Sequence, residues 1–186
     1  EFHQLGWNYR LTEFQAAILL VQLTRLEEQD ARRMENARYL SSQVEAIGGL
    51  QPLRWDERAT KHSHHIYILR YDPGAFGGLS RAQFVEALNA EGIPAFTGYT
   101  FPLYANPMFV NQAFHGKGCP IACQHYGKKV DYAAYAAKCP AAEQACYQES
   151  VWLEHRLLLG DRSDMDDIVE AIAKIKANMA ELVPSQ

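Results

Sequence analysis

The chain has 186 residues, of which 48% are hydrophobic, 22% charged and 11% aromatic. This composition is that of a globular protein with enough apolar side chains for a core. The formal net charge is −4 and no basic cluster stands out, so nucleic acid is not an expected partner. The longest apolar run, residues 16–21, is far shorter than the roughly 20 residues that cross a bilayer. The length suits one domain, or slightly more than one.

All four cysteines lie in the stretch from Cys119 to Cys146. A secreted disulfide scaffold is usually a smaller chain with cysteines throughout, and no secretory signal is visible, so we expect reduced thiols and a cytoplasmic protein. Cys119 and Cys123 have the spacing of one zinc pair, and His125 and Cys139 are the other candidates for a zinc site. Because His125 lies too close to Cys123 to open a second pair, packed thiols are favoured and no metal ligand is assigned.

The first predicted helix opens with a capping box, in which Thr12 is the N-cap and a glutamine follows three residues later. Its apolar pattern runs to about Ile47, and Gly48-Gly49 ends it. Residues 16–26 are apolar on nearly every side, which predicts an interface. The second half has an ordinary one-sided stripe. A break near Gln29-Asp30 would separate the two parts.

Residues 66–71 are β-branched and aromatic and predict a strand that ends at Asp72-Pro73-Gly74. A second capping box at Ser80 opens a helix that Gly92 closes. Residues 97–138 are rich in Pro, Gly, Tyr and Asn and have no sustained period. Long irregular stretches of this kind are usually functional or disordered, and the many aromatic residues argue against disorder.

Toward the C-terminus, Pro140 predicts the first turn of a helix that runs to about Gln148. Residues 151–153 and 156–159 predict strands or extended chain, and residues 163–166 are expected to cap a final helix. This order of elements predicts the α+β class. We expect a two-layer domain with a short, mainly antiparallel sheet and helices on one face.

Four segments, taken together and in this order, resemble the DegT/DnrJ/StrS family of sugar aminotransferases. They are Gly6-Trp7-Asn8-Tyr9-Arg10 before the first helix; His65-Ile66-Tyr67; Gly92-Ile93-Pro94 with Tyr99 and Pro102-Leu103-Tyr104; and Cys139-Pro140-Ala141-Ala142-Glu143 with Val151-Trp152-Leu153 and His155. The family usually has proline where this chain has Glu154. The resemblance covers nearly the whole chain, and residues 119–159 are similar to members that aminate keto-cyclitols.

The resemblance implies a fold-type-I enzyme that uses pyridoxal 5'-phosphate. It assigns residues 1–30 to the end of the large domain and to a helix that contacts both the other domain and a second subunit, and residues 31–186 to the C-terminal small domain. The family keeps its cofactor-binding lysine, and the carboxylate at the pyridine nitrogen, upstream of the Asn-Tyr-Arg segment. We therefore expect this chain to lack the Schiff-base lysine, to contain no catalytic residue and to be inactive alone.

The resemblance also names candidate binding residues. Asn8 corresponds to the family asparagine that reaches the cofactor phosphate of the neighbouring subunit, and Arg10 could bind a phosphate or carboxylate through its planar guanidinium. His65, Tyr99 and Tyr104 are the candidate substrate-binding residues. A structural role stays open for each: Asn8 and Arg10 could anchor the next helix, His65 could be a hydrogen-bonded structural residue, and the tyrosines could pack in the core.

The predicted function is transfer of an amino group from glutamate or glutamine to a keto-sugar or keto-cyclitol, by an enzyme that is homodimeric. The alternative is a non-catalytic module of the same family that only dimerises or binds a partner, which the apolar first helix favours. A small zinc-stabilised domain is a third possibility.

Overall fold

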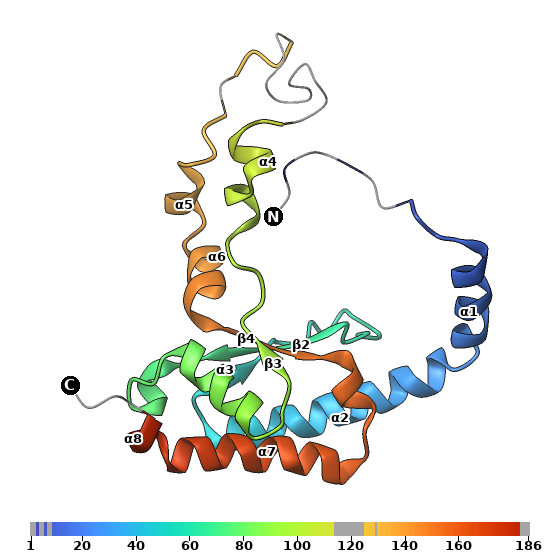
Figure 1. The fold of residues 1–186 in the computed structure, drawn as a ribbon, viewed down its shortest axis with the longest axis vertical. Coiled ribbons are helices and arrows are strands. Elements are labelled where there is room, and N and C mark those ends of the chain that lie inside the picture. Colours follow the sequence, from blue (N-terminus) through green and yellow to red (C-terminus); the bar gives the residue numbers. More distant parts are fainter. Residues whose placement is uncertain (1–2, 4–5, 7–8, 114–124, 129, 183–186) are drawn as a thin grey trace. The chain divides into compact units, whose positions relative to one another are not determined.

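The computed structural model of the protein describes residues 3, 6, 9–113, 125–128 and 130–182 (Figure 1). It divides into two compact units. One comprises residues 13–98 and 148–186, and the other comprises residues 1–12 and 99–147. The expected boundary between a large and a small domain near residue 30 stays a prediction.

The larger unit is built on a four-stranded sheet with the strand order β1-β2-β4-β3. The strands are β1 (Leu50–Pro52), β2 (Ile66–Tyr71), β3 (Ala95–Phe96) and β4 (Ser150–Glu154). Every neighbouring pair is antiparallel, and Ile66 lies opposite Glu154 across the central pair. The prediction of an antiparallel α+β domain is therefore confirmed, and the strand expected at residues 66–71 has the predicted bounds.

One face of this sheet packs against helices (Figure 1). Tyr67, Leu69 and Tyr71 alternate with less buried residues along β2, as the period of a strand requires. They share one apolar core with the buried side chains of three helices. These helices are α2 (Leu26–Ile47), α3 (Arg81–Ala90) and α7 (Arg162–Ala177), which the short helix α8 (Met179–Leu182) follows.

An aromatic cluster forms one end of this core. The rings of Tyr71, Phe76 and Phe84 lie 4.7 to 5.0 Å apart, centre to centre. The Tyr71 hydroxyl donates a 2.8 Å hydrogen bond to the carbonyl oxygen of Leu79, so its burial leaves no unpaired donor. The cluster joins β2 to the start of α3, where Ser80 forms the expected capping box with Gln83.

The long N-terminal helical pattern is two helices rather than one. Helix α1 (Glu13–Leu23) ends at a turn, and α2 begins at Leu26, several residues before the expected break. The Thr24 hydroxyl donates a hydrogen bond to the carbonyl oxygen of Val21, in the last turn of α1. Gly48 ends α2 with a positive φ of 78°, as its sequence position predicts.

Two local predictions near the C-terminus were wrong. Residues 155–159 form a 3-10 turn instead of extended chain, because the sheet pairing of β4 ends at Glu154. The last long helix is capped by Asp161, not by residues 163–166. Asp161 accepts hydrogen bonds from the backbone of Ser163 and Asp164, and the Asp164 carboxylate accepts one from the Asp161 backbone in return.

The second unit holds most of the irregular stretch predicted from the sequence. Its helices are short: α4 (Pro107–Val110), α5 (Tyr135–Lys138) and α6 (Pro140–Gln144). A row of aromatic rings connects them, with centroid distances of 5.5 to 6.0 Å from Phe109 through Tyr132 and Tyr135 to Tyr104. These contacts order a segment that has little regular secondary structure of its own.

A buried amide connects α2 to the turn after β4. The Asn36 side chain donates to the carbonyl oxygens of Leu158 and Gly160, at 3.0 and 2.9 Å. Replacing Asn36 with alanine leaves two carbonyl oxygens without their donor, so we expect the free energy of unfolding to fall by about 1–3 kcal/mol. Urea denaturation followed by circular dichroism measures this loss.

Ser42→Ala is the matched control on the same helix, because Ser42 is exposed and bonds only within its own turn. Its expected change is within about 0.5 kcal/mol. Equal stability of the two variants would contradict a structural role for Asn36.

Candidate functional site

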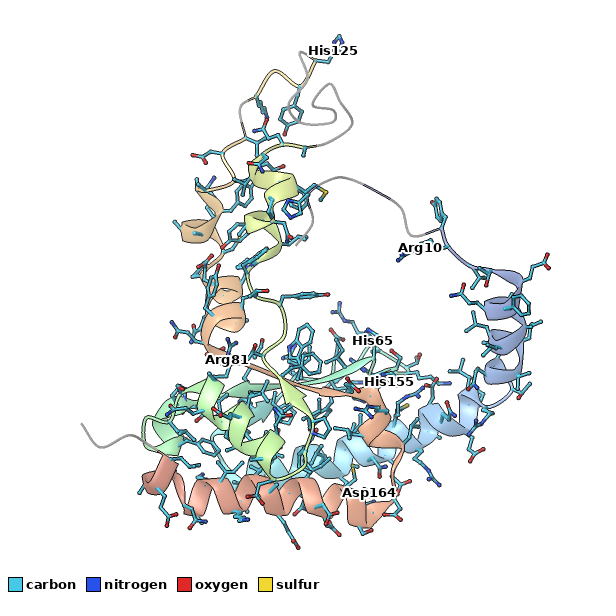
Figure 2. All side chains as sticks on the ribbon, viewed as in Figure 1. Arg10, His65, Arg81, His125, His155 and Asp164 are labelled. Atoms are coloured by element: carbon cyan, nitrogen blue, oxygen red, sulfur yellow. The ribbon has the colours of Figure 1, made fainter. Side chains whose placement is uncertain are left out.

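His65 is the one substrate-binding candidate in the larger unit. It precedes β2 on the exposed surface, and its ring stacks on that of His155, with centroids 6.1 Å apart and planes 21° from parallel (Figure 2). The antiparallel register produces this pair, since Ile66 and Glu154 are opposed and the two histidines come directly before and after them. Beside them, Arg156 pairs with Glu154. The structure thus joins two histidines that belong to different segments of the family resemblance.

His155 was not among the predicted site residues. Its position in the fourth resembling segment was the only signal that the sequence offered. Pairing it with His65 requires the register of β2 against β4, which the sequence does not contain.

Tyr104 and Tyr99 lie in the second unit. The Tyr104 hydroxyl donates to the carboxylate of Glu143, and partial burial together with this hydrogen bond raises the pKa of Tyr104. Tyr104 thus makes packing and hydrogen-bond contacts with its own unit. Tyr99 is different, with 68% of its side chain exposed. Of the two, Tyr99 is the more exposed to solvent.

The cofactor-binding candidates precede α1. Asn8 lies outside the described residues. Arg10 is described and exposed (Figure 2). Assignment of both residues to a cofactor phosphate stays a prediction.

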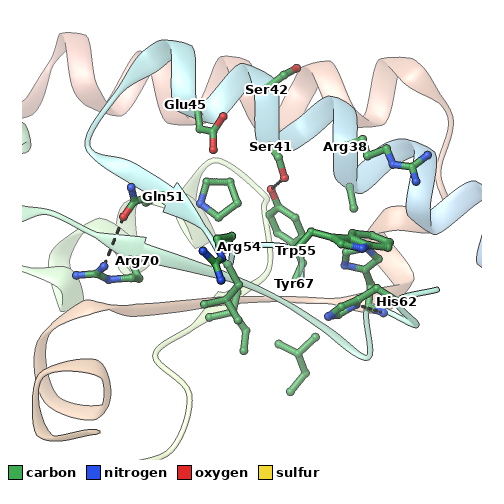
Figure 3. A pocket seen from close by; sticks show the side chains of 16 residues that line it. Arg38, Ser41, Ser42, Glu45, Gln51, Arg54, Trp55, His62, Tyr67 and Arg70 are labelled. Atoms are coloured by element: carbon green, nitrogen blue, oxygen red, sulfur yellow. Dashed lines mark hydrogen bonds between the residues drawn. The ribbon is translucent and has the colours of Figure 1, made fainter. Parts of the chain in front are cut away.

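The larger unit contains a pocket of about 630 Å³ between α2 and the β1–β2 edge of the sheet (Figure 3). Trp55 and His62, from the segment that connects the two strands, lie with Arg38 at one end of it. His64, from the same segment, packs against both rings. Both histidines lie in this connecting segment, and His64 is only 9% exposed.

His64 is held in an unusual environment. Its backbone has a φ of 46°, in the left-handed region that few side chains other than Asn, Asp and His adopt. Its Nε2 atom is buried without a hydrogen-bond partner among the described residues. Burial, followed by the positive charges of His62, Arg33 and Arg38, lowers the pKa of His64 to about 4.

None of the described lysines lines the pocket described above. Lys61 pairs with Glu27, Lys174 with Glu91, and Lys176 donates to two backbone carbonyl oxygens at the end of α2. These contacts suit solvated or structural lysines, so none of the three is assigned a covalent bond to the cofactor.

The zinc alternative rests partly on Cys119 and Cys123, which lie outside the described residues. Within the residues that the structure describes, no group of three or more His, Cys, Asp or Glu side chains could hold a metal ion. No helix in the same part of the chain is both long and apolar enough to cross a membrane.

Comparison with known proteins identifies the family of the chain. Residues 1–137 match the DegT/DnrJ/EryC1/StrS aminotransferase family. The chain belongs to this family. The match extends over the segment before α1, the His65 strand and most of the aromatic second unit. The family members in general depend on pyridoxal phosphate.

Individual relatives cover nearly all of the chain. It is 36% identical over 182 residues to a protein of Micromonospora echinospora named as an L-glutamine:3-amino-2,3-dideoxy-scyllo-inosose aminotransferase, covering 97% of this chain and 42% of that protein. It is 34% identical to the L-glutamine:2-deoxy-scyllo-inosose aminotransferase of Streptoalloteichus tenebrarius, covering 96% and 40%. The crystal structure of 3-amino-5-hydroxybenzoic acid synthase superposes with a TM-score of 0.72 at 31% identity, covering 95% and 42%. The chain thus spans about two fifths of the length of these family members.

His64 makes stability depend on pH. Above the usual histidine pKa of about 6.5, His64 is neutral in both states and contributes no pH dependence. As the pH falls from 6.5 toward 4, the unfolded chain binds a proton that the folded chain does not, so the free energy of unfolding decreases by up to about 3 kcal/mol. Urea denaturation at pH 7 and pH 4.5 measures the difference.

His64→Asn removes the titrating ring and keeps a residue that tolerates a positive φ. We expect this variant to lose less stability than the parent between the two pH values. His65→Asn is the control and should keep the parent's difference. An unchanged difference in His64→Asn would show that His64 does not titrate as its burial requires.

Proposed function

We propose that the protein containing this chain is a pyridoxal-phosphate-dependent aminotransferase that moves an amino group from glutamine to the ring ketone of a keto-cyclitol. The observation that carries the proposal is similarity over nearly the whole chain to relatives named for glutamine and inosose substrates. Glutamate as donor and a keto-sugar as acceptor are the closest variants of this reaction. The chain would act in the cytoplasm, as the clustering of its four cysteines in residues 119–146 suggests.

In this proposal the chain's residues bind and orient the cofactor and the acceptor. The rest of the protein supplies the lysine that bonds covalently to the cofactor. When bound, the cofactor supplies the electron sink that lets an amino group leave one carbon and join another. Asn8 and Arg10 would donate to its phosphate. His65, beside His155 on the exposed surface, would contact the acceptor through its imidazole group, as sugar-binding sites commonly do. Tyr99, considered by itself, stays a candidate for a hydroxyl contact to the acceptor.

A second candidate function is a module that only associates. Helix α1 supports it, because none of its residues is buried and its large apolar side chains are exposed. Phe14, for example, is 86% exposed and Ile18 is 62% exposed. An apolar helix of this kind is normally covered by another surface. In an aminotransferase the same helix would contact the large domain and a second subunit, so the two candidates differ in catalysis and not in association.

Amination by the longer protein tests the proposal directly. Incubated with L-glutamine, pyridoxal phosphate and 2-deoxy-scyllo-inosose, it should convert the ketone to the amine, detected by mass spectrometry as loss of one oxygen and gain of one nitrogen and three hydrogens. Omitting glutamine is the control. His65→Ala should lower kcat/KM by about tenfold, as loss of one polar contact to the acceptor would. Absence of the amine with both glutamine and glutamate, and with keto-sugars also offered, would favour the association module.

Borohydride reduction tests where the lysine is. The 186-residue chain is incubated with pyridoxal phosphate and then reduced. We expect no stoichiometric adduct, and any label should be non-specific and spread over several lysines. The longer protein should gain one stoichiometric adduct at a lysine outside this chain. A stoichiometric adduct on a single lysine of this chain would contradict the proposal. Asn8→Ala in the longer protein should weaken cofactor retention on dialysis.

Association through α1 is the third test. The chain alone should scatter light as a species larger than its 21.1 kDa mass, because the exposed side chains of α1 would be covered by another copy. The double variant Phe14→Glu, Ile18→Glu should shift it toward the monomer, while Gln22→Glu on the same helix should not. A monodisperse monomer at all concentrations would contradict association through α1.

A further inference from the structure

The pocket between α2 and the β1–β2 edge is distinct from the histidine pair at the end of β2 and is not used by the proposed reaction. Its volume of about 630 Å³ is within the usual range for small-molecule sites. It has one aromatic end and one polar wall. The aromatic end comes from the segment between β1 and β2, and the polar wall comes from α2 (Figure 3).

The aromatic end is a closely packed group of rings. Trp55 lies 5.7 Å from His62 and 5.9 Å from His64, centre to centre, and the two histidine rings lie 4.2 Å apart. The Arg38 guanidinium sits 5.5 Å from the centre of the Trp55 ring. Such an arrangement offers ring faces for stacking and a cation beside them.

Charge in the pocket is mostly positive. Three arginines and a single carboxylate, Glu45, line it. Arg70 is already held by Glu149, at 3.0 Å, and Arg38 covers Trp55. Arg54 forms no ion pair with any carboxylate among the described residues. It therefore has a planar group of donors available for an anion, the geometry that binds a carboxylate through two parallel hydrogen bonds.

Neutral polar groups complete the site. The Ser41 and Tyr67 hydroxyls bond to each other at 2.8 Å on the wall of the pocket (Figure 3). His64, nine-tenths buried at the aromatic end, has an Nε2 atom with no partner in the described part of the chain. A buried polar atom without a partner is uncommon in folded proteins and is accounted for when a ligand or water supplies one. The left-handed backbone of His64 adds strain of a kind that clusters at binding sites.

We propose that this pocket binds a small ring-bearing carboxylate, whose anionic group pairs with Arg54 and whose ring packs against Trp55 and His62. A purely apolar ligand would leave the arginine charge unneutralised, and a simple inorganic anion would leave the ring faces uncovered. The proposal does not rest on the aminotransferase function, because none of its residues is assigned to the cofactor or the acceptor.

The test uses phenylacetate as probe on the full chain, with two matched molecules that each lack one feature. Acetate has the carboxylate without the ring, and benzyl alcohol has the ring without the charge. The Trp55 indole resonance, identified by its absence in Trp55→Leu, reports binding in nitrogen–proton correlation spectra. At low ionic strength phenylacetate should shift this resonance saturably, with a dissociation constant on the order of 1 mM for a ligand of this size.

Acetate and benzyl alcohol should each bind at least about tenfold more weakly, since each loses one of the two contacts. Arg54→Ala should weaken phenylacetate binding by a similar factor. Arg58→Ala is the matched control and should leave binding unchanged, because Arg58 is exposed, pairs with Asp56 and does not line the pocket. Circular dichroism confirms that both variants are folded.

Several outcomes would overturn the proposal. They are a Trp55 resonance that phenylacetate does not shift saturably, equal affinity for phenylacetate and either of the two partial probes, and Arg54→Ala binding as well as the parent. No cofactor or amination enters any of these measurements. Failure here therefore leaves the aminotransferase proposal intact, and failure of that proposal leaves this one intact.

Discussion

The pairing of β2 with β4 is the contact on which the larger unit depends. It joins residues 66–71 to residues 150–154, and most of the second unit lies between them in the chain. Closing so long a loop costs conformational entropy. Burial of the apolar side chains of Tyr67, Leu69, Val151 and Leu153 offsets this cost. The same pairing sets the stacked histidines side by side, so the core and the candidate site share one register.

Buried polar groups then fix the helices over this sheet. Asn36 connects α2 to the turn after β4 through two carbonyl oxygens. Asp30 and Arg33 pair with each other on the buried side of the same helix. Neither arrangement is a strong source of net stability, since removing polar groups from water is costly, but breaking either leaves an unpaired group inside. The two bonds of Asn36 favour one position of α2 against the turn.

The candidate sites differ in their exposure to solvent. The His65–His155 pair lies on the exposed surface at the end of a regular strand pair, where a substrate or another domain can reach it. The pocket around Trp55 is lined by side chains from α2, β1, β2 and the segment between the two strands, and the buried His64 is part of this lining. The Tyr104 hydroxyl, by contrast, already donates a hydrogen bond to Glu143, and its ring contacts that of Tyr135. A substrate can reach an exposed pair from solvent, and a concave pocket can cover more of a ligand's surface.

Local pattern in the sequence is sufficient for the α+β class, the strand at residues 66–71, the capping box at Ser80 and the family. Its signals are alternation of apolar residues, a hydroxyl three residues before a glutamine, and motifs in a fixed order. The folded chain was needed to show that residues 155–159 turn, that Asp161 caps α7, that His155 lies beside His65 and that His64 is buried in a pocket. Each of these depends on which distant strand or helix lies alongside, and that choice is made by packing and register rather than by neighbours in the chain.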